Sequence, residues 1–238
     1  MVYDFQESVK LRFIKALRAA VAVPFIDDIE DFIVESIWAY ANTIQIPDPF
    51  FTTRSKKLYD VVDPEKKTGW SVKSVQYAFA PGTRFELVIQ RADIFKKANA
   101  LGYESLSINT DPQILGEALL KHWQEKVTQD AAAQGVDSKR VFILLKQRSS
   151  YEYAMFEEDI RLYSNDEISW HWTDNTHTGL QGTRKSDKEC VYRWYPNQKQ
   201  LFEGFFLPEK IESFSIAPVR IPINQAVDLL VQHIEGNQ

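Results

Sequence analysis

Apolar residues recur at helical spacing in the N-terminal part of the chain. In residues 4–22, DFQESVKLRFIKALRAAVA, they return every three or four positions, which predicts an amphipathic helix that Pro24 ends or redirects. A second helix is predicted over 27–43, with acidic residues in its first turn, where the helix dipole favours them. The PDP sequence at 47–49 then breaks the chain.

Short β-type runs follow the break. FFTTRSK (50–56) is a weak strand candidate, whereas KLYDVV (57–62) and GWSVKSVQYAF (69–79) flank the turn sequence DPEKKTG and predict a hairpin. RFELVIQ (84–90) predicts one more strand, and RADIFKKANALG (91–102) predicts a helix that stops at Gly102.

A long helix and a fully apolar strand complete the first 147 residues. The helix is predicted over 112–134, with Asp111 as N-cap, Pro112 at its first position and Gly135 after its end. The continuous apolar run VFILLK (141–146) is typical of a strand that is buried on both faces and parallel to a neighbour.

The last third of the chain alternates apolar and polar residues. YEYAMFEEDIRLY, ISWHWTD, CVYRWYP and LFEGFFLP predict antiparallel strands separated by polar loops, and INQAVDLLVQHIEG predicts a closing helix. We therefore expect an α/β fold with a mixed central sheet flanked by helices and a β-rich C-terminal part. The expected domains are an α/β core with N-terminal helices over 1–147 and a β-rich subdomain over 148–238, which ends in the helix.

Composition removes several function classes. The 238 residues carry a net charge of −5, which counts against a protein that coats nucleic acid nonspecifically, although a local basic cleft is still possible. No apolar run approaches the roughly 20 residues that cross a bilayer. Four His and one Cys exclude a closed zinc site of usual composition. The single Cys190, and a start without a signal pattern, predict a reducing, cytoplasmic location.

Two charged residues interrupt the predicted hairpin. With the turn centred between Glu65 and Lys66, Asp60 lies opposite Ser71, and Lys73 is its diagonal neighbour on the same face as Ser71. An exposed cross-strand ion pair is one interpretation. Metal-assisted phosphodiester hydrolysis is the other, because Mg²⁺ takes one or two carboxylates and a lysine can orient water or stabilise charge on the phosphate.

The order of these elements carries a resemblance. A helix, a hairpin with Asp60 and then Ser-Val-Lys ending at Lys73, a helix and a buried strand resemble the PD-(D/E)XK nuclease superfamily, and most of all a type II restriction endonuclease, over residues 27–147. The resemblance implies Asp60 as metal ligand and Lys73 as the motif lysine. Tyr59 stands where the family often has Pro, and Ser71 where an acid is usual.

A second carboxylate is therefore expected from elsewhere in the fold. Glu86 in RFELV is preferred as the second metal ligand, so that the catalytic set is Asp60, Ser71, Lys73 and Glu86. Glu30 is the other candidate, because it borders the apolar stripe of the predicted helix 27–43, from which Glu35 projects away.

The C-terminal third carries side chains that read purine edges or neutralise phosphates. The DNA-binding candidates are Asn175, Gln181, Arg184, Lys185, Arg193, Asn197, Gln198 and Lys199. An amphipathic β subdomain whose polar residues are merely exposed is the alternative.

Together these features predict a Mg²⁺-dependent, site-specific endonuclease that cleaves double-stranded DNA. The resemblance further implies a homodimer and a cognate methyltransferase acting on the same site. A repair or junction-specific nuclease of the same fold, or a non-catalytic DNA-binding or interaction module, are the alternatives.

Overall fold

The computed structural model describes residues 2–25, 29–45, 57–76, 83–147, 151–209, 211–217 and 219–236. In these ranges the chain forms two compact units. Unit 1 combines Met1–Phe79, Gln134–Asp159 and Lys210–Gln238, and unit 2 combines Ala80–Ala133 and Ile160–Glu209. The domain boundary expected at residue 147 falls within unit 1, between two strands that pair with each other.

Unit 1 is built on a mixed sheet, here called sheet A, with strand order β1-β2-β4-β5-β10. Strands β2 and β4 are parallel, and the other neighbours are antiparallel. The strands are β1 (Val61–Asp63), β2 (Thr68–Gln76), β4 (Ser138–Gln147), β5 (Glu152–Asp159) and β10 (Glu212–Ser215). The α/β class, the mixed sheet and the buried parallel strand β4 are confirmed.

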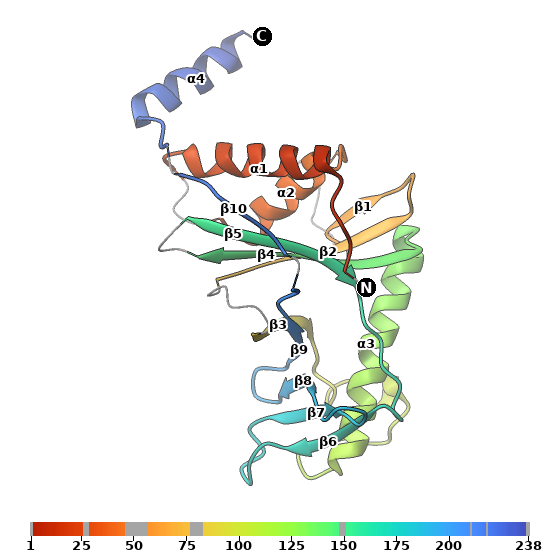
Figure 1. The fold of residues 1–238 in the computed structure, drawn as a ribbon. Helices are drawn as coiled ribbons and strands as arrows, with labels where there is room; N and C mark the ends of the chain where they lie inside the picture. The colour runs from red at the N-terminus through yellow and green to blue at the C-terminus, as the bar shows by residue number, and fades with distance from the viewer. Residues whose placement is uncertain are drawn as a thin grey trace. The chain divides into compact units, whose positions relative to one another are not determined.

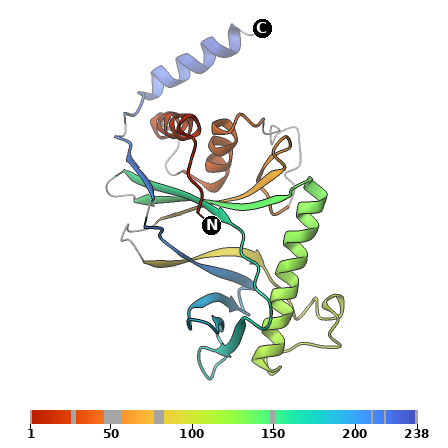
Figure 2. The same cartoon turned by 45° about the vertical axis from the view of Figure 1, so that its right-hand side comes forward.

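Helices α1 (Glu7–Ala22) and α2 (Asp31–Ala41) cover one face of sheet A (Figures 1 and 2). Their apolar faces close on aromatic residues of the strands: the rings of Trp38 and Phe142 stack with centroids 3.9 Å apart. Trp70 and Val72 of β2 lie in the same core. Because side chains alternate along a strand, Ser71 and Lys73 take the opposite face of the sheet.

Unit 2 contains an antiparallel sheet, here called sheet B, with strand order β3-β9-β8-β7-β6. Its helix α3 (Pro112–Gln134) packs on the sheet so closely that a Cβ on Gly116 would overlap the Trp170 indole. Asp111 caps α3, accepting a 2.8 Å bond from the Gln113 amide, as expected. The strands are β3 (Arg84–Arg91), β6 (Ile168–Trp172), β7 (Leu180–Arg184), β8 (Cys190–Tyr195) and β9 (Gln200–Phe206).

Several predicted elements differ from the structure. The helix expected over 91–102 is wrong: the segment forms turns and one 3-10 helix, η1 (Asn99–Leu101), before Gly102 takes a φ of 84°. The strand at 84–90 joins β9 in sheet B and does not extend the N-terminal sheet. Strands β7 and β10 occupy segments without a predicted strand. The weak candidate at 50–56 lies outside the described residues. The closing helix forms as α4 (Ile223–Glu235).

Candidate functional site

The hairpin that carries the candidate catalytic residues has the expected register. Val61 pairs with Trp70, and Asp63 pairs with Thr68. Asp60 precedes β1, and its amide donates to the carbonyl of Trp70 at 2.9 Å. The predicted register of the hairpin is therefore confirmed for Val61–Asp63, and Asp60 lies directly before the paired strand.

Asp63 fixes the turn of this hairpin. Its Oδ1 accepts 3.0 Å hydrogen bonds from the amides of Glu65 and Lys66, and its Oδ2 pairs with the Lys66 ammonium at 2.9 Å. Lys67 completes the turn with a φ of 49°. Burial by itself would raise the pKa of the Asp63 carboxyl, but the bonds from Lys66 and Glu65 outweigh it, so the pKa lies below its ordinary value.

The Asp60 carboxylate is anchored to the neighbouring strand. Its Oδ2 accepts a 2.9 Å hydrogen bond from the backbone amide of Val72. This bond holds the carboxylate beside the peptide segment between Ser71 and Lys73, while Asp60 as a residue stays exposed. An exposed carboxylate with a fixed position is suited to bind a cation together with solvent or substrate oxygens.

Lys73 lies on β2 in a half-buried position. Across the parallel pair its neighbour is Ile143, which is fully buried. Its ammonium makes no ion pair with any described residue, and Asp60 and Lys73 do not form the cross-strand ion pair of the alternative interpretation. Ser71 beside it is buried, at 4% exposure. The structure thus leaves the lysine charge without a protein counter-ion in the described ranges.

The Tyr59 side chain packs against the start of the hairpin. The Tyr59 ring lies over Gly69, where an added Cβ would come within 2.8 Å of the ring and 2.7 Å of Val136. The Tyr59 carbonyl accepts a 2.9 Å bond from the Gln134 amide group. Tyr59 therefore packs the start of the hairpin directly next to Asp60.

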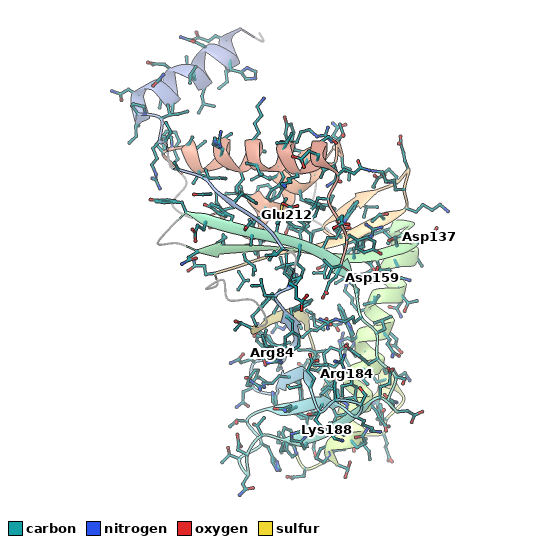
Figure 3. The ribbon with its side chains drawn as sticks, in the orientation of Figure 1. Arg84, Asp137, Asp159, Arg184, Lys188 and Glu212 are labelled. Carbon is teal, nitrogen blue, oxygen red and sulfur yellow. The ribbon has the colours of Figure 1, made fainter. Side chains whose placement is uncertain are left out.

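Glu86 is engaged by two guanidinium groups of sheet B. Its Oε1 accepts from Arg84 Nη1 at 2.8 Å and pairs with Arg193 Nη1 at 3.3 Å. Arg84, labelled in Figure 3, also donates through Nε to the Cys190 carbonyl at 3.0 Å. Glu86 belongs to unit 2 and Asp60 to unit 1. A metal bound at Glu86 would have to compete with both arginines.

Glu30 and Glu35, in the segment of the second helix, are oriented differently from the prediction. Glu30 is exposed and precedes α2 as its N-cap residue, with extended backbone. Glu35 is 8% exposed and lies on the buried side, in contact with other parts of the chain. The prediction fails because α2 is buried over more than one stripe, with consecutive buried positions at Ile37, Trp38 and Ala39.

Glu35 is the acid that sequence reasoning missed. It is a buried carboxylate on α2, which packs against β1 and β2 on the face of sheet A that carries Trp70 and Val72, opposite to Lys73. Buried acids are rare and need a partner or a cation. In the sequence, the only sign of this burial is that Glu35 stands within the largely apolar stretch FIVESIWAYA.

The possible metal ligands among the described side chains are His, Cys, Asp and Glu residues. Among them, no group of three or more His, Cys, Asp or Glu residues is placed to hold a metal ion. A site with one anchored carboxylate, Asp60, and further oxygens from water and phosphate fits Mg²⁺, which commonly binds proteins through one or two carboxylates. The residues present therefore fit a magnesium ion that is held jointly with substrate.

The DNA-binding candidates divide between the two ends of sheet B. In an antiparallel meander successive loops alternate between the ends of the sheet, so the β6–β7 and β8–β9 loops share one end. Asn175 lies in the first of these loops, and Asn197 and Gln198 lie in the second, all exposed. Arg184 and Lys185 lie at the opposite end, with the β7–β8 turn.

Four of the candidates are held by neighbouring side chains. Arg184 (Figure 3) donates to the carboxylates of Asp187 at 2.6 Å and Glu189 at 2.5 Å, and these hydrogen bonds raise its pKa above the ordinary range. Arg193 donates to Gln181 at 3.4 Å in addition to its contact with Glu86. Lys199 pairs with Asp93 at 2.7 Å. The exposed members without such partners among the described residues are Asn175, Lys185, Asn197 and Gln198.

The β6–β7 loop is ordered by one carboxylate. Asp174 accepts hydrogen bonds from the amides and hydroxyls of Thr176 and Thr178, and these bonds lower its pKa far below the ordinary value. The rings of Trp172 and His177 stack at 4.5 Å between centroids. His177 is therefore packed, and the loop presents Asn175 on a fixed backbone.

No helix in the described ranges combines the length and apolar character needed to cross a bilayer. No family model matches the sequence, no curated protein is significantly similar to it, and no solved structure matches the chain. The function is therefore inferred from the residues alone.

Proposed function

We propose that this chain is a Mg²⁺-dependent endonuclease that cleaves double-stranded DNA at specific sites, in the manner of a type II restriction enzyme. One observation carries the proposal. The Asp60 carboxylate is anchored to the Val72 amide beside Lys73, and Lys73 has no counter-ion among the described residues. The anchored Asp60 carboxylate suits a cation, and the Lys73 ammonium on the paired strand suits a phosphate.

Each residue of this set has a separate task in the proposed reaction. Asp60 would hold the magnesium ion together with water and phosphate oxygens. The ion, when bound, supplies polarisation of the phosphate and a water of lowered pKa. Lys73 binds the scissile phosphate, orients the attacking water and stabilises the negative charge that develops on phosphorus oxygens. The Ser71 hydroxyl, buried beside them, helps to position these groups.

Sequence recognition is assigned to the end of sheet B that carries exposed amides. Asn175, Asn197 and Gln198 present carboxamide groups, which pair with adenine edges in the major groove. The Asp174 network keeps the Asn175 loop ordered before DNA binds, which lowers the entropy lost on binding. Two copies acting on a palindrome would cut both strands, and a methyltransferase of matching specificity is the expected genomic partner.

Digestion of long unmethylated duplex DNA tests the function. Wild-type protein with Mg²⁺ is expected to give discrete fragments, and both EDTA and Lys73→Ala are expected to abolish them. Lys66→Ala is the matched control, because Lys66 lies in the same hairpin but serves only the turn through Asp63. Intact DNA with the wild type, under varied divalent ions and salt, would refute the nuclease.

Two alternatives give different results in the same assay. A repair or junction-specific nuclease of this fold produces a metal-dependent smear on linear DNA, or cuts only branched substrates. A non-catalytic DNA-binding module shifts duplex DNA in a gel without cutting it, and Lys73→Ala leaves that shift unchanged.

A further inference from the structure

One histidine of unit 2 is buried against two nitrogen donors. His122 on α3 is 6% exposed, whereas the other three histidines of the chain are half-buried or exposed. Its Nε2 faces Lys97 Nζ at 3.3 Å and Gln90 Nε2 at 3.2 Å. An ammonium group has no lone pair and can only donate, so the Nε2 that faces Lys97 is the unprotonated nitrogen of a neutral imidazole.

The other surroundings of the ring also favour the neutral form. The backbone of Arg91 makes a hydrogen bond with the imidazole, and the Nδ1–H group is the donor that is left for it. The charged groups that act on the ring are two cations, Lys97 after β3 and Lys126 one turn along α3. Lys126 pairs with Asp130 at 2.5 Å, whereas Lys97 pairs with no carboxylate in the described ranges. Burial and the two positive charges lower the pKa of His122 below its ordinary value.

Gln90 offers a different partner to a protonated ring. Its Oε1 is buried and has no hydrogen-bond partner among the described residues. Turning the carboxamide over would place this oxygen where Nε2 now lies, and it could then accept from a proton on Nε2 of His122. Lys97 has no such alternative, because its ammonium would be repelled by an imidazolium.

The segment that carries Lys97 supports the β8–β9 loop. At the start of this segment, 92–101, the Ala92 amide donates to the Lys199 carbonyl at 2.7 Å. The Trp194 indole donates in turn to the Ala92 carbonyl at 2.9 Å. The contact between Lys97 and His122 therefore links α3, through this segment, to the loop that carries the exposed amides of sheet B.

We propose that His122, Lys97 and Gln90 form a pH-sensitive latch between α3 and the segment 92–101. The latch is closed while the imidazole is neutral and accepts from Lys97. When Nε2 takes up a proton from solvent, Gln90 turns its Oε1 to the ring, Lys97 is expelled, and the segment loosens together with the β8–β9 loop. The open state binds the proton more tightly, so the opening equilibrium constant rises by at most about tenfold per pH unit below the ordinary imidazole pKa of about 6.5.

An NMR titration of the full chain tests the environment of the ring. The carbon-bound protons of the His122 imidazole should titrate with a midpoint below about 6.5. Lys97→Met keeps the length of the side chain but removes its charge, so it should raise this midpoint by at least about 0.3 pH units. Lys96→Met is the matched control, because Lys96 is equally exposed but does not act on His122, and it should leave the midpoint unchanged.

Hydrogen exchange tests the opening of the segment. Between pH 7 and pH 5, after correction for the intrinsic exchange rate, the protection of the Ala92 and Leu101 amides should fall by at least about threefold. In His122→Gln the carboxamide oxygen can accept from Lys97 but does not titrate, so protection should stay constant. The amide of Phe142 in β4 of unit 1 reports any change in global stability.

Four results would overturn the proposal. They are a His122 midpoint at or above 6.5, a midpoint that Lys97→Met leaves unchanged, equal protection of the wild-type segment at both pH values, and a loss of protection that His122→Gln shares. Lys97 is exposed, so its replacement leaves the folded core in place. Both measurements are made without DNA or metal, and their outcome is therefore independent of the proposed nuclease activity.

Discussion

Asp60 has two separable roles, and two substitutions distinguish them. Asp60→Asn keeps a side-chain oxygen that can accept from the Val72 amide, but it removes the charge. Asp60→Ala removes both. The bond joins Oδ2 to the Val72 nitrogen at 2.9 Å, and Val72 is 1% exposed, so the alanine variant leaves a buried amide without its acceptor.

The expected losses follow from these contacts. An unsatisfied buried amide costs about 1–2 kcal/mol, so Asp60→Ala should lower the free energy of unfolding by that amount, whereas Asp60→Asn should lower it by less than about 0.5 kcal/mol. In urea, 1–2 kcal/mol corresponds to a midpoint shift of about 0.5–1 M. Both variants should lose DNA cleavage by at least about 100-fold, because each lacks the carboxylate that binds the cation.

Urea denaturation followed by tryptophan fluorescence, together with the initial rate of plasmid cleavage, measures both effects on the same samples. Cleavage by Asp60→Asn at the wild-type rate would refute the role of Asp60 as cation ligand. Equal destabilisation by the two substitutions would refute the structural role of the Val72 bond. The two roles are supported when the variants differ in stability but lose cleavage equally.

Three further predictions concern the hairpin and the DNA surface. Gly69→Ala should lower the free energy of unfolding by about 1–3 kcal/mol in urea denaturation, since its Cβ would clash with the Tyr59 ring, and an unchanged midpoint would contradict that packing. The pKa of Asp63 is lowered by folding, so its stabilisation is complete above the unfolded pKa of about 4 and disappears as the pH falls through the lower native value; the stability gap between wild type and Asp63→Asn should close there. Lys185→Ala should reduce the salt dependence of DNA binding by about one unit in anisotropy titrations, whereas Arg184→Ala, which removes an internally paired cation, should leave that slope unchanged.

Local sequence patterns predicted the helices and strands of this protein better than they predicted which strands pair with each other. The hairpin register followed from the strand alternation and the turn sequence, and the structure pairs Val61 with Trp70 as expected. The helix over 112–134 was visible from Asp111, Pro112 and Gly135, all of which act at its ends. These signals are local because caps and turns act within a few residues.

Long-range pairing had no comparable signal. Strand β3 pairs with β9, more than a hundred residues later in the chain, and alternation alone does not specify which strand is the neighbour. The segment 91–102 has the spacing of a helix, but its start is held by Lys199, whose carbonyl accepts from the Ala92 amide at 2.7 Å. Tertiary contacts of this kind override local propensity.

For the site residues, the sequence did not predict which side chains pair with each other. Glu86, Arg184 and Arg193 have the residue types expected for catalysis or DNA contact, yet each is engaged by an oppositely charged neighbour. Asp60 and Lys73 could be placed because a hairpin register relates them directly. The burial of Glu35 depends on how α2 sits on the sheet, which hydrophobic periodicity describes only coarsely.

The chain passes between the two units four times, and this has a consequence for folding during synthesis. Strand β2 is made early, but its parallel neighbour β4 begins only at Ser138, and the edge strand β10 begins at Glu212. Sheet A therefore cannot be completed until the chain has been made through β10. Its contacts span large sequence separations, which predicts slow folding for its size. Until β4 is made, β2 presents an open edge, which can pair with other chains.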